Sequence, residues 1–573
     1  MKITRQAGTC KTEAFLRDLP VGMQNGFMMP NRAPLAYLLV SLVAGLSLAR
    51  VDSNIGLWIA FVGLGGACGT LLLAGRQGNG VWLWGSLFLL SRSAVFWSYG
   101  ILRLPPVPEV ASLSNAPREQ EIHLEIRRVF NQGSSSSKRI CGIGFIPKGS
   151  PHDSLIAGTQ VYFNIHANPE IHEHLLKGVQ FVSAGVLRPV RDSDTSGFYE
   201  YLRSNRMYYR FSQNATLAIT REASAFRRFC AVQHARFLEI LQFDASGARD
   251  PARVYVAMLL GERANLNEEQ KRRYQVSGTM HLFAISGLHI GVLASVLALS
   301  LRVLRIPNRI APFLGLPLLY LYFVITGEAP SAMRAFVMTF FFWLAYSLQR
   351  QRNPFAALMA SAVAVLLINP LQLWSLGFQL SYVVVGSILL FGLPFQMVLT
   401  RWARPFRWLP ENDWTPAQRI SQKGIDGTLL LFAVSLSAWL GSIPLSLGHF
   451  GYLSLAAVVL NMVLVNMAAL VICTGCLSLV CGLSISIELA GFINHAAWLL
   501  ISAMDLLSGW VASLPGMVLE TTDFPLPLSY ATLIAYFIML IVANQKPQRI
   551  GIRQLLLAPG ILILLVVVGL WVA

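Results

Sequence analysis

The sequence predicts a polytopic α-helical membrane protein with a small β domain outside the membrane, between the third and fourth spans. Its 573 residues are 54% hydrophobic and only 13% charged, with a mean hydropathy of +0.55. Ordinary soluble domains lie outside this range. Apolar segments of about 20 residues, the length that crosses a bilayer, recur along the chain. One long polar segment, from 103 to about 275, interrupts them.

The apolar segments define the order of the expected spans. Residues 1–33 are basic and too polar for a signal peptide, so we expect a cytoplasmic tail there. Three N-terminal spans are expected within 34–102. By hydropathy, roughly ten more candidates follow the polar segment, near 281–302, 310–326, 331–348, 354–369, 372–392, 428–447, 453–484, 486–513, 527–543 and 555–573. The segment 453–484 is long enough for a broken or re-entrant helix.

Basic residues in short loops indicate which side of the membrane each loop occupies. Cytoplasmic loops are enriched in Lys and Arg, which predicts an inside location for Arg302, Arg305, Arg309, Arg350, Arg352, Arg401, Arg404, Arg407, Arg419, Lys423, Lys546, Arg549 and Arg553. The alternate loops, 327–331 and 448–452, contain neither residue type. This arrangement places the long polar segment outside. The same bias explains the formal charge of +17, which by itself does not indicate nucleic-acid binding.

The external segment has two parts. Within 103–222, apolar residues alternate with polar ones, as in Ile122, Leu124, Ile126 and Val161, Phe163, Ile165. Period-two alternation interrupted by Gly, Ser, Pro and Asn predicts a small antiparallel sheet or barrel. Residues 223–280 have a helical, amphipathic pattern, and we expect those helices to lie at the membrane surface.

The fourth span opens with an unusual concentration of polar and small residues, HLFAISGLHIGVL at 281–293. On a helix, His281, Ser286 and His289 would share one side, and Gly287 and Gly291 would form a GxxxG pair on the other. Small residues at that spacing allow a second helix to approach closely. Polar residues in a span face a bundle interior or a wet cavity. Either a tightly packed helix or a helix lining a hydrated path fits this pattern.

Other polar residues at membrane depth extend this candidate path. Arg334 lies near the outer end of its span, where it could reach the interface or offer a cation to an anionic substrate. The later spans contribute Gln379, Ser381, Asn461 and Asn466. Asp505 is interpreted as an interhelical hydrogen-bond partner, and Arg92 as a packing or interfacial residue.

Several of these segments resemble the ComEC family of competence proteins. The similar elements are MLLGERANLNEEQKRRYQVSGTMHLFAISGLHIGVL at 258–293, TGEAPSAMRAFVM at 326–338, INPLQLWSLGFQLSYVVVG at 368–386 and WLGSIPLSLGHFGYLSLAAVVLNMVLV at 439–465. A further element, SGFYEYLRSNRMYYRF at 196–211, looks like the one that closes the family's external domain. Four motifs in family order are a specific signal, and the resemblance covers roughly 30–545.

The resemblance implies an inner-membrane channel that admits one strand of transforming DNA. The external domain would be an OB-like barrel, residues 281–545 the channel domain, and 546–573 a cytoplasmic basic loop with the last span. Basic and aromatic residues on such a barrel would bind a single strand, here Arg127, Arg128, Lys138, Arg139, Tyr162 and Phe163. The implied partners are single-stranded DNA, a periplasmic DNA receptor, and a cytosolic helicase or single-strand-binding proteins.

The sequence departs from many relatives at its C-terminal end. Those relatives carry a metallo-β-lactamase-like domain with a His-x-His-x-Asp-His cluster, whereas this chain ends at Ala573 without one; His172 and His174 lack the continuation. We therefore expect a transport channel rather than an enzyme, with any nuclease supplied separately and no metal or cofactor. No GxxxxGK[ST] motif is present, so a partner or a gradient must supply the energy.

Two other classes of function remain open. In a membrane-embedded hydrolase, His281 and His289 would bind a metal or perform acid/base chemistry, although no acidic third ligand lies near them in sequence. A transporter of another anion or of a lipid-linked substrate would use the glycine-bearing helices for alternating access. Cys473 and Cys476 have a CxxC spacing, but they lie in an apolar span and are interpreted as packing residues.

Overall fold

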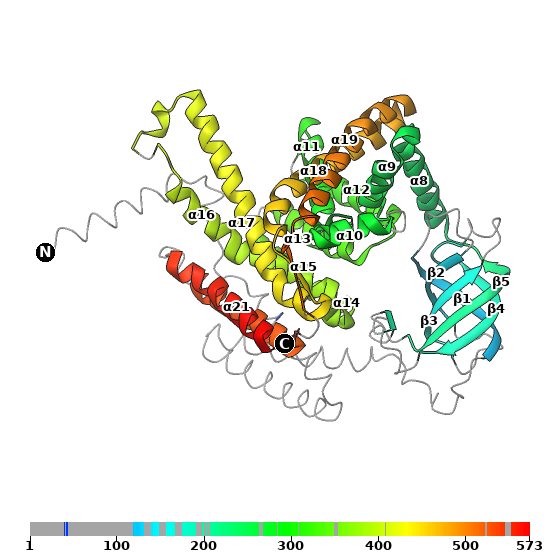
Figure 1. Ribbon diagram of the computed structural model, residues 1–573. Helices are drawn as coiled ribbons and strands as arrows, with labels where there is room; N and C mark the ends of the chain where they lie inside the picture. Colours follow the sequence, from blue (N-terminus) through cyan, green and yellow to red (C-terminus); the bar gives the residue numbers. More distant parts are fainter. Residues whose placement is uncertain are drawn as a thin grey trace, which may run out of the picture.

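The protein is a helical bundle with a small β barrel at its side (Figure 1). The computed structural model describes residues 118–130, 139–147, 156–166, 175–190, 207–262 and 267–572, with short gaps in the last range and a few isolated positions near 40 and 200. Apart from Leu39, Leu42 and Val43, the expected tail and first three spans lie outside the described residues. So do Lys138, His172 and His174.

The barrel confirms the predicted small β domain. Its strands are β1 (Arg118–Val129), β2 (Arg139–Phe145), β3 (Gln160–His166), β4 (Gln180–Pro189) and β5 (Tyr209–Arg221). They close in the order β1-β2-β3-β5-β4, with all pairs antiparallel except the parallel pair β3–β5. The alternating apolar residues fill the interior, as in Leu124, Val161 and Phe211. This is the five-stranded architecture of an OB-fold.

Three helices lead from the barrel into the bundle: α8 (Ala225–Gln242), α9 (Arg249–Leu260) and α10 (Glu268–Val276). That they lie at the membrane surface stays a prediction, but α8 and α9 also pack against other helices. The first turn of α8 contacts Glu328, between α12 and α13, and the Ile240 carbonyl near its end accepts a hydrogen bond of 2.8 Å from Asn494 of α19. Thus α8 runs along the side of the bundle (Figure 1).

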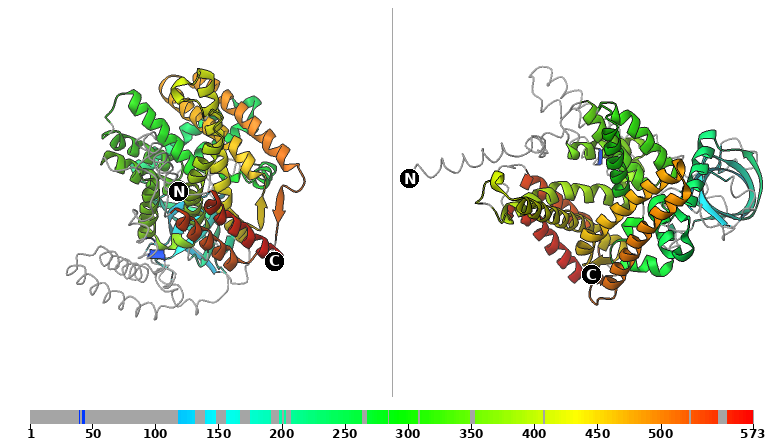
Figure 2. Two further views of the ribbon diagram at one scale, coloured as in Figure 1. Left: turned by 90° about the vertical axis from the view of Figure 1, so that its left-hand side faces the viewer. Right: turned by 90° about the horizontal axis from the view of Figure 1, so that it is seen from above.

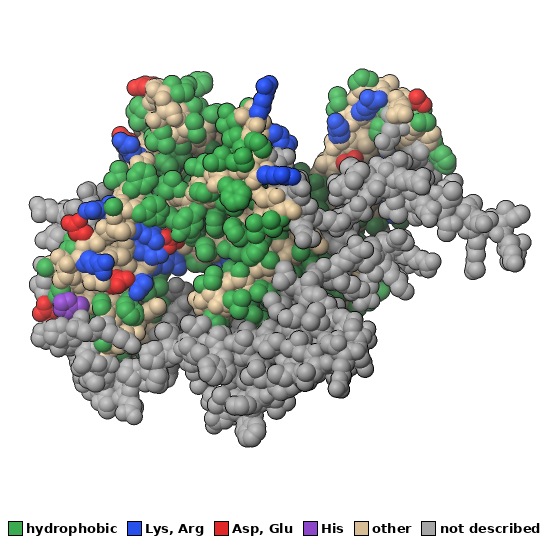
Figure 3. Space-filling view, turned by 180° about the vertical axis from the view of Figure 1, so that it is seen from behind, with side chains coloured by type: hydrophobic (Ala, Val, Ile, Leu, Met, Phe, Trp, Pro, Cys, Tyr) green, Lys and Arg blue, Asp and Glu red, His purple; other side chains and the backbone are tan. Residues whose placement is uncertain are grey.

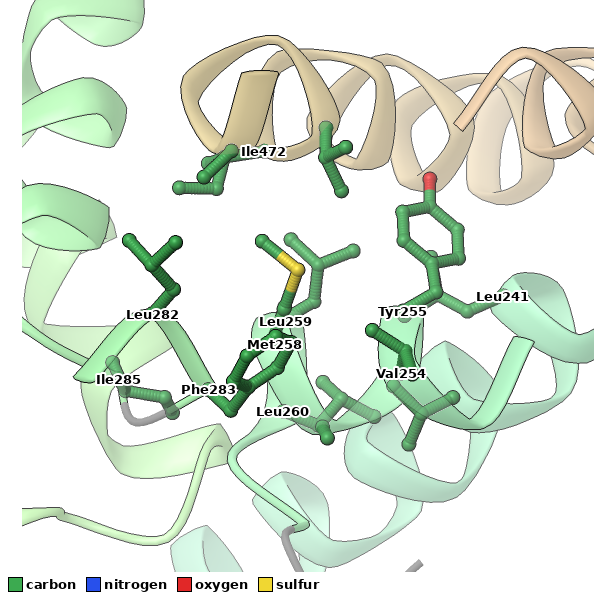
Figure 4. Close-up of a cluster of buried hydrophobic side chains, with 14 of the residues drawn as sticks. Leu241, Val254, Tyr255, Met258, Leu259, Leu260, Leu282, Phe283, Ile285 and Ile472 are labelled. Carbon is green, nitrogen blue, oxygen red and sulfur yellow. The ribbon is translucent and has the colours of Figure 1, made fainter. Parts of the chain in front are cut away.

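The composition of α9 explains this packing. Eight of its twelve residues are buried, including the run from Val254 to Leu260. A helix that is apolar on nearly all sides must be surrounded by other elements. Figure 4 shows Met258 and Leu259 within a cluster that includes Phe283 and Ile472, the latter from α18.

The remaining helices form the membrane bundle and confirm the polytopic prediction. They are α11 (Gly287–Val303), α12 (Ala311–Ile325), α13 (Pro330–Ser347), α14 (Pro354–Ile368), α15 (Leu376–Ser387), α16 (Leu393–Trp402), α17 (Pro416–Phe450), α18 (Ala457–Ser484), α19 (Ile487–Ala512), α20 (Leu526–Asn544) and α21 (Ile552–Val572). Within the described residues, five helical segments are long and apolar enough to span a bilayer alone: 376–402, 416–450, 457–484, 487–512 and 526–544. The others are shorter apolar helices.

Two details differ from the predicted spans. The segment 453–484 is not a broken helix, because a short strand β6 (Tyr452–Ser454) precedes the continuous α18 and pairs with β7 (Val518–Glu520). The span predicted at 372–392 continues to Trp402 through a π-helical turn, Ile388–Gly392, which joins α15 to α16. Asn544 of α20 donates a hydrogen bond of 2.9 Å to the Leu390 carbonyl within that turn, which satisfies a backbone group that the irregular geometry would leave unpaired.

The bundle has two chemically different ends. At one end α11, α13, α15, α18 and α20 begin, and Lys177 of the barrel contacts the α12–α13 turn there; we call it the barrel end. The opposite end, which the sequence predicts to be cytoplasmic, contains the exposed arginines Arg302, Arg305 and Arg401. Figure 2 shows the barrel standing beside the helices, and Figure 3 shows the largely apolar surface of the bundle between the charged regions.

Candidate functional site

The start of α11 organises the first group of polar residues. Ser286 is the N-cap, and a capping box forms in which its Oγ lies 3.1 Å from His289 Nδ1 while its own N–H donates to that nitrogen at 3.3 Å. Such a box satisfies backbone donors at a helix start. The helix therefore begins at Gly287, and the prediction that His281 lies on the same helical side is wrong. His281 belongs to a 3-10 turn, Met280–Phe283, where its Nδ1 is 3.2 Å from the Gly278 carbonyl.

The described helices do not use Gly287 and Gly291 as a close-packed GxxxG pair. Within the described part of the chain, a side chain at Gly287 would approach only Ala335 of α13, at 3.9 Å, and one at Gly291 would meet nothing within 4 Å. The close contacts lie elsewhere: an ideal Cβ at Gly441 of α17 would fall 2.9 Å from the Ser387 Cβ of α15. There the absence of a side chain lets two helices meet.

His289 has one ring nitrogen available for a hydrogen bond inside the bundle. Its side chain is fully buried. Because Nδ1 accepts the Ser286 N–H, the neutral imidazole carries its proton on Nε2. Among the described residues, Nε2 has no hydrogen-bond partner, and an unpaired buried donor costs about 1–3 kcal/mol. The imidazole can therefore donate a hydrogen bond to an acceptor that enters the site.

Arg334 places a positive charge inside the bundle. It lies in the second turn of α13 and is only 4% exposed. Its Nε and Nη2 donate to Ser381 Oγ of α15 at 3.1 and 3.0 Å. No carboxylate among the described residues pairs with it. A buried charge without a counter-ion is expensive, and such residues in membrane proteins mark functional sites.

A glycine lies directly against the Arg334 guanidinium. A Cβ at Gly377, one turn before Ser381 on α15, would lie 3.3 Å from Arg334 Nη2. Gly377 is itself exposed. The buried guanidinium therefore lies next to an exposed position of the backbone, and its planar fork of donors suits recognition of an anion such as a phosphate.

Further polar residues lie on α13, α15, α17 and α20 near the barrel end. On α13, Ser331 Oγ donates to the Ile285 carbonyl at 2.5 Å, immediately before the α11 cap. On α15, Gln379 Nε2 donates to the Leu373 carbonyl at 3.1 Å, and its Oε1 accepts from Tyr530 OH at 3.2 Å. His449 Nε2 of α17 lies 3.4 Å from the same hydroxyl.

These residues form what we call the polar layer, composed of Ser286, His289, Ser331, Arg334, Gln379, Ser381, His449 and Tyr530. It crosses α11, α13, α15, α20 and α17 near the barrel end. A shallow open cavity of about 760 Å³ adjoins it, lined by His449, Gly451, Thr521 and their neighbours. Sequence reasoning missed Tyr530 and His449, because only the fold brings α17 and α20 to Gln379.

The other predicted residues play different parts. Asn461 of α18 buries its Oδ1 without a hydrogen-bond partner among the described residues, on a helix that contributes no residue to the polar layer. Asn466 donates to the Met462 carbonyl of its own helix at 2.7 Å. Asp505 lies against Gln270 and Arg273 of α10, as expected of an interhelical partner.

The predicted DNA-binding residues of the barrel divide into two groups. Phe163 is fully buried in the barrel core, so its assignment to the binding surface is wrong. Tyr162, Arg127 and Arg128 lie outside, with Arg127 paired to Glu125 at 3.3 Å and positioned over the Phe145 ring. Arg139 begins β2, and its side chain lies outside the described atoms.

A row of aromatic rings crosses the outside of the barrel. Phe130 stacks on Tyr162 with centroids 6.4 Å apart, Tyr162 meets Phe198 at 5.0 Å, and Phe198 meets Tyr199 at 5.8 Å. Phe130 and Phe198 are 40% and 41% exposed. Burial, and then the hydrogen bond with Cys141, raises the pKa of Tyr162 above its usual range, so the phenol stays neutral.

Two arginines flank this aromatic row. Arg128 lies over Phe130, 5.2 Å from the centroid, and Arg210 lies over Tyr199 at 5.7 Å and donates to its hydroxyl at 2.8 Å. The row and its arginines are adjacent to strands β2 and β3, the face with which OB-folds bind oligonucleotides. Aromatic rings with interspersed cations are typical of single-strand binding.

His234 fastens α8 to the barrel end. Its Nδ1 lies 2.9 Å from the Ile325 carbonyl and its Nε2 lies 2.9 Å from Glu262 Oε1. Burial alone would lower the pKa of His234, but the hydrogen bond and charge of Glu262, together with the carbonyl, raise it above the ordinary value of 6.5. Two acceptors at the two ring nitrogens favour the doubly protonated imidazolium.

This arrangement makes a prediction about stability and pH. A raised pKa in the folded state stabilises fully below the ordinary pKa, and the contribution disappears as the pH rises through the raised value. We expect the melting temperature of the full chain in nanodiscs to fall as the pH rises from about 6.5, the ordinary histidine value, through the raised pKa, and to fall less in a His234→Gln variant. Equal pH dependence in the two proteins would contradict the charged state of His234.

Comparisons with known proteins agree with this architecture. The model of the competence protein family matches residues 258–546, which include α11 to α20. Among curated proteins, ComE operon protein 3 of Bacillus subtilis is 31% identical over 316 residues, covering 54% of this chain and 36% of that protein. Recombination protein 2 of Haemophilus influenzae is 29% identical over 297 residues, covering 50% and 35%. No solved structure shows a significant match.

The matches are restricted in length. A third relative, the uncharacterized protein YcaI of Escherichia coli, is 27% identical over 168 residues, which cover 28% of this chain and 20% of that protein. Each match thus covers little more than a third of the relative, or less. The family model nevertheless matches just over half of this chain and contains the whole polar layer. The chain therefore belongs to the competence protein family.

Proposed function

We propose that this chain is an inner-membrane channel for the uptake of single-stranded transforming DNA during natural competence. The observation that carries the proposal is Arg334, a buried guanidinium without a described carboxylate partner, hydrogen-bonded to Ser381 and adjacent to the exposed Gly377. A passing phosphodiester would supply the missing anion. The remaining members of the polar layer are uncharged or weakly basic, and conduction requires that binding is weak enough to release.

The barrel supports the same proposal from outside the bundle. Its aromatic row and flanking arginines would hold a strand by stacking and by phosphate attraction, before the strand reaches Arg334. We further propose that a periplasmic receptor delivers the DNA and that a separate nuclease degrades the complementary strand. A cytosolic helicase or single-strand-binding proteins would receive the strand at the end of the bundle opposite the barrel end.

Uptake of labelled DNA by a competent deletion strain complemented with this chain tests the proposal. We expect label on one strand to reach the cytosol, and none to enter the uncomplemented strain. Label that accumulates at the cell surface of the complemented strain, although the protein is present in the membrane, would contradict a channel role.

A transporter of another anion is the second candidate, because Arg334 would also bind a small anion such as phosphate. The aromatic row favours the nucleic-acid function, since a small inorganic anion has no base to stack on it. Competition separates the two: excess inorganic phosphate should leave oligonucleotide binding to the nanodisc-embedded chain nearly unchanged beyond the effect of ionic strength. Strong specific inhibition would favour the small-anion transporter.

A further inference from the structure

The turn between α12 and α13 has an unusual backbone. Gly327 and Glu328 both have positive φ, at 86° and 54°. Glycine adopts this region readily, but a residue with a side chain does so rarely. Glu328 therefore has an uncommon backbone conformation, and its carboxylate makes two ion pairs.

The Glu328 carboxylate receives cations from two separate parts of the chain. Lys177, in the β3–β4 connection of the barrel, donates to Oε2, and Arg227, in the first turn of α8, donates to Oε1. The Glu328 side chain is 19% exposed, whereas those of Arg227 and Lys177 are 27% and 39% exposed. One carboxylate thus occupies the space between a lysine and an arginine.

Two cations that converge from different elements are also the arrangement that binds a phosphate. We propose that Lys177 and Arg227 form a phosphodiester-binding site for a single strand, which Glu328 masks in this structure. The inference rests on the proposed function and deepens it, because the strand's phosphates would displace the carboxylate. Here the carboxylate oxygens stand in for the two phosphate oxygens.

The position of the site supports this assignment. Glu328 directly precedes α13, and Ser331 and Arg334 lie in the first two turns of that helix. Lys177 belongs to the barrel, which carries the aromatic row. A strand that extends from the barrel to Arg334 therefore passes the Lys177–Glu328–Arg227 group.

The contacts also allow the mask to open. Burial alone would raise the pKa of Glu328, but the hydrogen bonds from Lys177 and Arg227 hold it below its usual range, so the carboxylate is charged and must be displaced as an ion. The partly exposed ion pair to Lys177 is open to competition from other anions. The second attachment of α8, through His234 to Ile325 and Glu262, does not involve Glu328. Displacement would therefore free Lys177 and Arg227 without detaching α8.

The test measures binding of a labelled oligothymidylate to the full chain in nanodiscs. Glu328→Gln removes the mask and keeps the shape, and we expect it to raise the affinity at least about fivefold, a typical coupling between two sites. Glu222→Gln is the matched control, because Glu222 forms an exposed ion pair with Arg228, the neighbour of Arg227 on α8. The control removes the same charge nearby and should change the affinity much less.

Lys177→Gln, made with and without Glu328→Gln, tests the mechanism. With the mask present, this substitution should lower the affinity little, whereas in the Glu328→Gln background it should remove most of the gain. Equal effects of Glu328→Gln and Glu222→Gln, or equal effects of Lys177→Gln in both backgrounds, would overturn the masked site. Failure of the unmodified chain and all variants to bind DNA would instead contradict the proposed function.

Discussion

Replacing Arg334 with Met is expected to impair DNA uptake severely while the protein remains folded and present in the membrane at normal levels. The side chain is 4% exposed and has no described carboxylate partner, so its removal leaves no opposite charge unpaired. Replacing buried charges with apolar residues of similar volume is often neutral or stabilising, by about 1–4 kcal/mol. Loss of function should therefore accompany unchanged or increased stability.

The size of the functional effect follows from the loss of the proposed charge pair between Arg334 and a phosphate of the strand. Removing one partner of a desolvated charge pair costs about 2–5 kcal/mol, which corresponds to a decrease in uptake of roughly 30-fold to several thousand-fold. Transformation frequency in the complemented deletion strain measures the effect, and membrane immunoblots with thermal unfolding measure abundance and stability. If Arg334 were required only for packing, the Met variant would instead have reduced thermal stability.

Two further variants make the result specific. Arg334→Lys keeps the charge but loses the fork that donates to Ser381, so we expect incomplete recovery, because lysine does not replace arginine at bidentate sites. Arg253→Gln removes an exposed arginine that pairs with Asp250 within α9, outside the polar layer and the barrel, and should leave uptake near normal. If Arg334→Met transformed as well as the unchanged protein, Arg334 would not line the route.

The sequence indicates Arg334 because a single cation within a span is expensive, whatever its partners are. Its hydrogen bond to Ser381, 47 residues away, and its proximity to Gly377 depend on how α13 and α15 cross. The same limit applies to Tyr530, which meets Gln379 across 151 residues. Hydropathy identifies which segments span, but it carries no information about which polar groups become neighbours.

Two errors in the sequence interpretation had signals that could have corrected them. Adjacent residues of a strand face opposite sides, so Tyr162 and Phe163 could not both lie on the outer surface. The alternation of Val161, Phe163 and Ile165 already indicated the core. At 286–289, Ser-x-x-His resembles the capping-box pattern, which predicts a helix that starts at Gly287 and excludes His281 from its face.

The aromatic row of the barrel provides the second large expected effect. Replacing Phe130, Tyr162 and Phe198 together with Ala should weaken oligothymidylate binding by the full chain in nanodiscs by two orders of magnitude or more. Each base stacked on an aromatic ring contributes about 1–3 kcal/mol, so the loss of two stacked bases is sufficient for this change. Phe226→Ala is the matched control, since Phe226 is 47% exposed but lies on α8.

The dependence on salt separates stacking from charge. Stacking releases no counter-ions, so the triple variant should lower the affinity at every salt concentration and leave the slope of log K against log[salt] unchanged. Arg128→Gln should instead reduce the steepness by about 0.7, the value for one phosphate contact of a single strand. If the triple variant changed the slope and Arg128→Gln did not, the rings would act by positioning cations, and the strand would lie elsewhere on the barrel. An unchanged affinity in the triple variant would exclude this face as the binding surface, because the exposed rings of Phe130 and Phe198 are the ones that bases could reach.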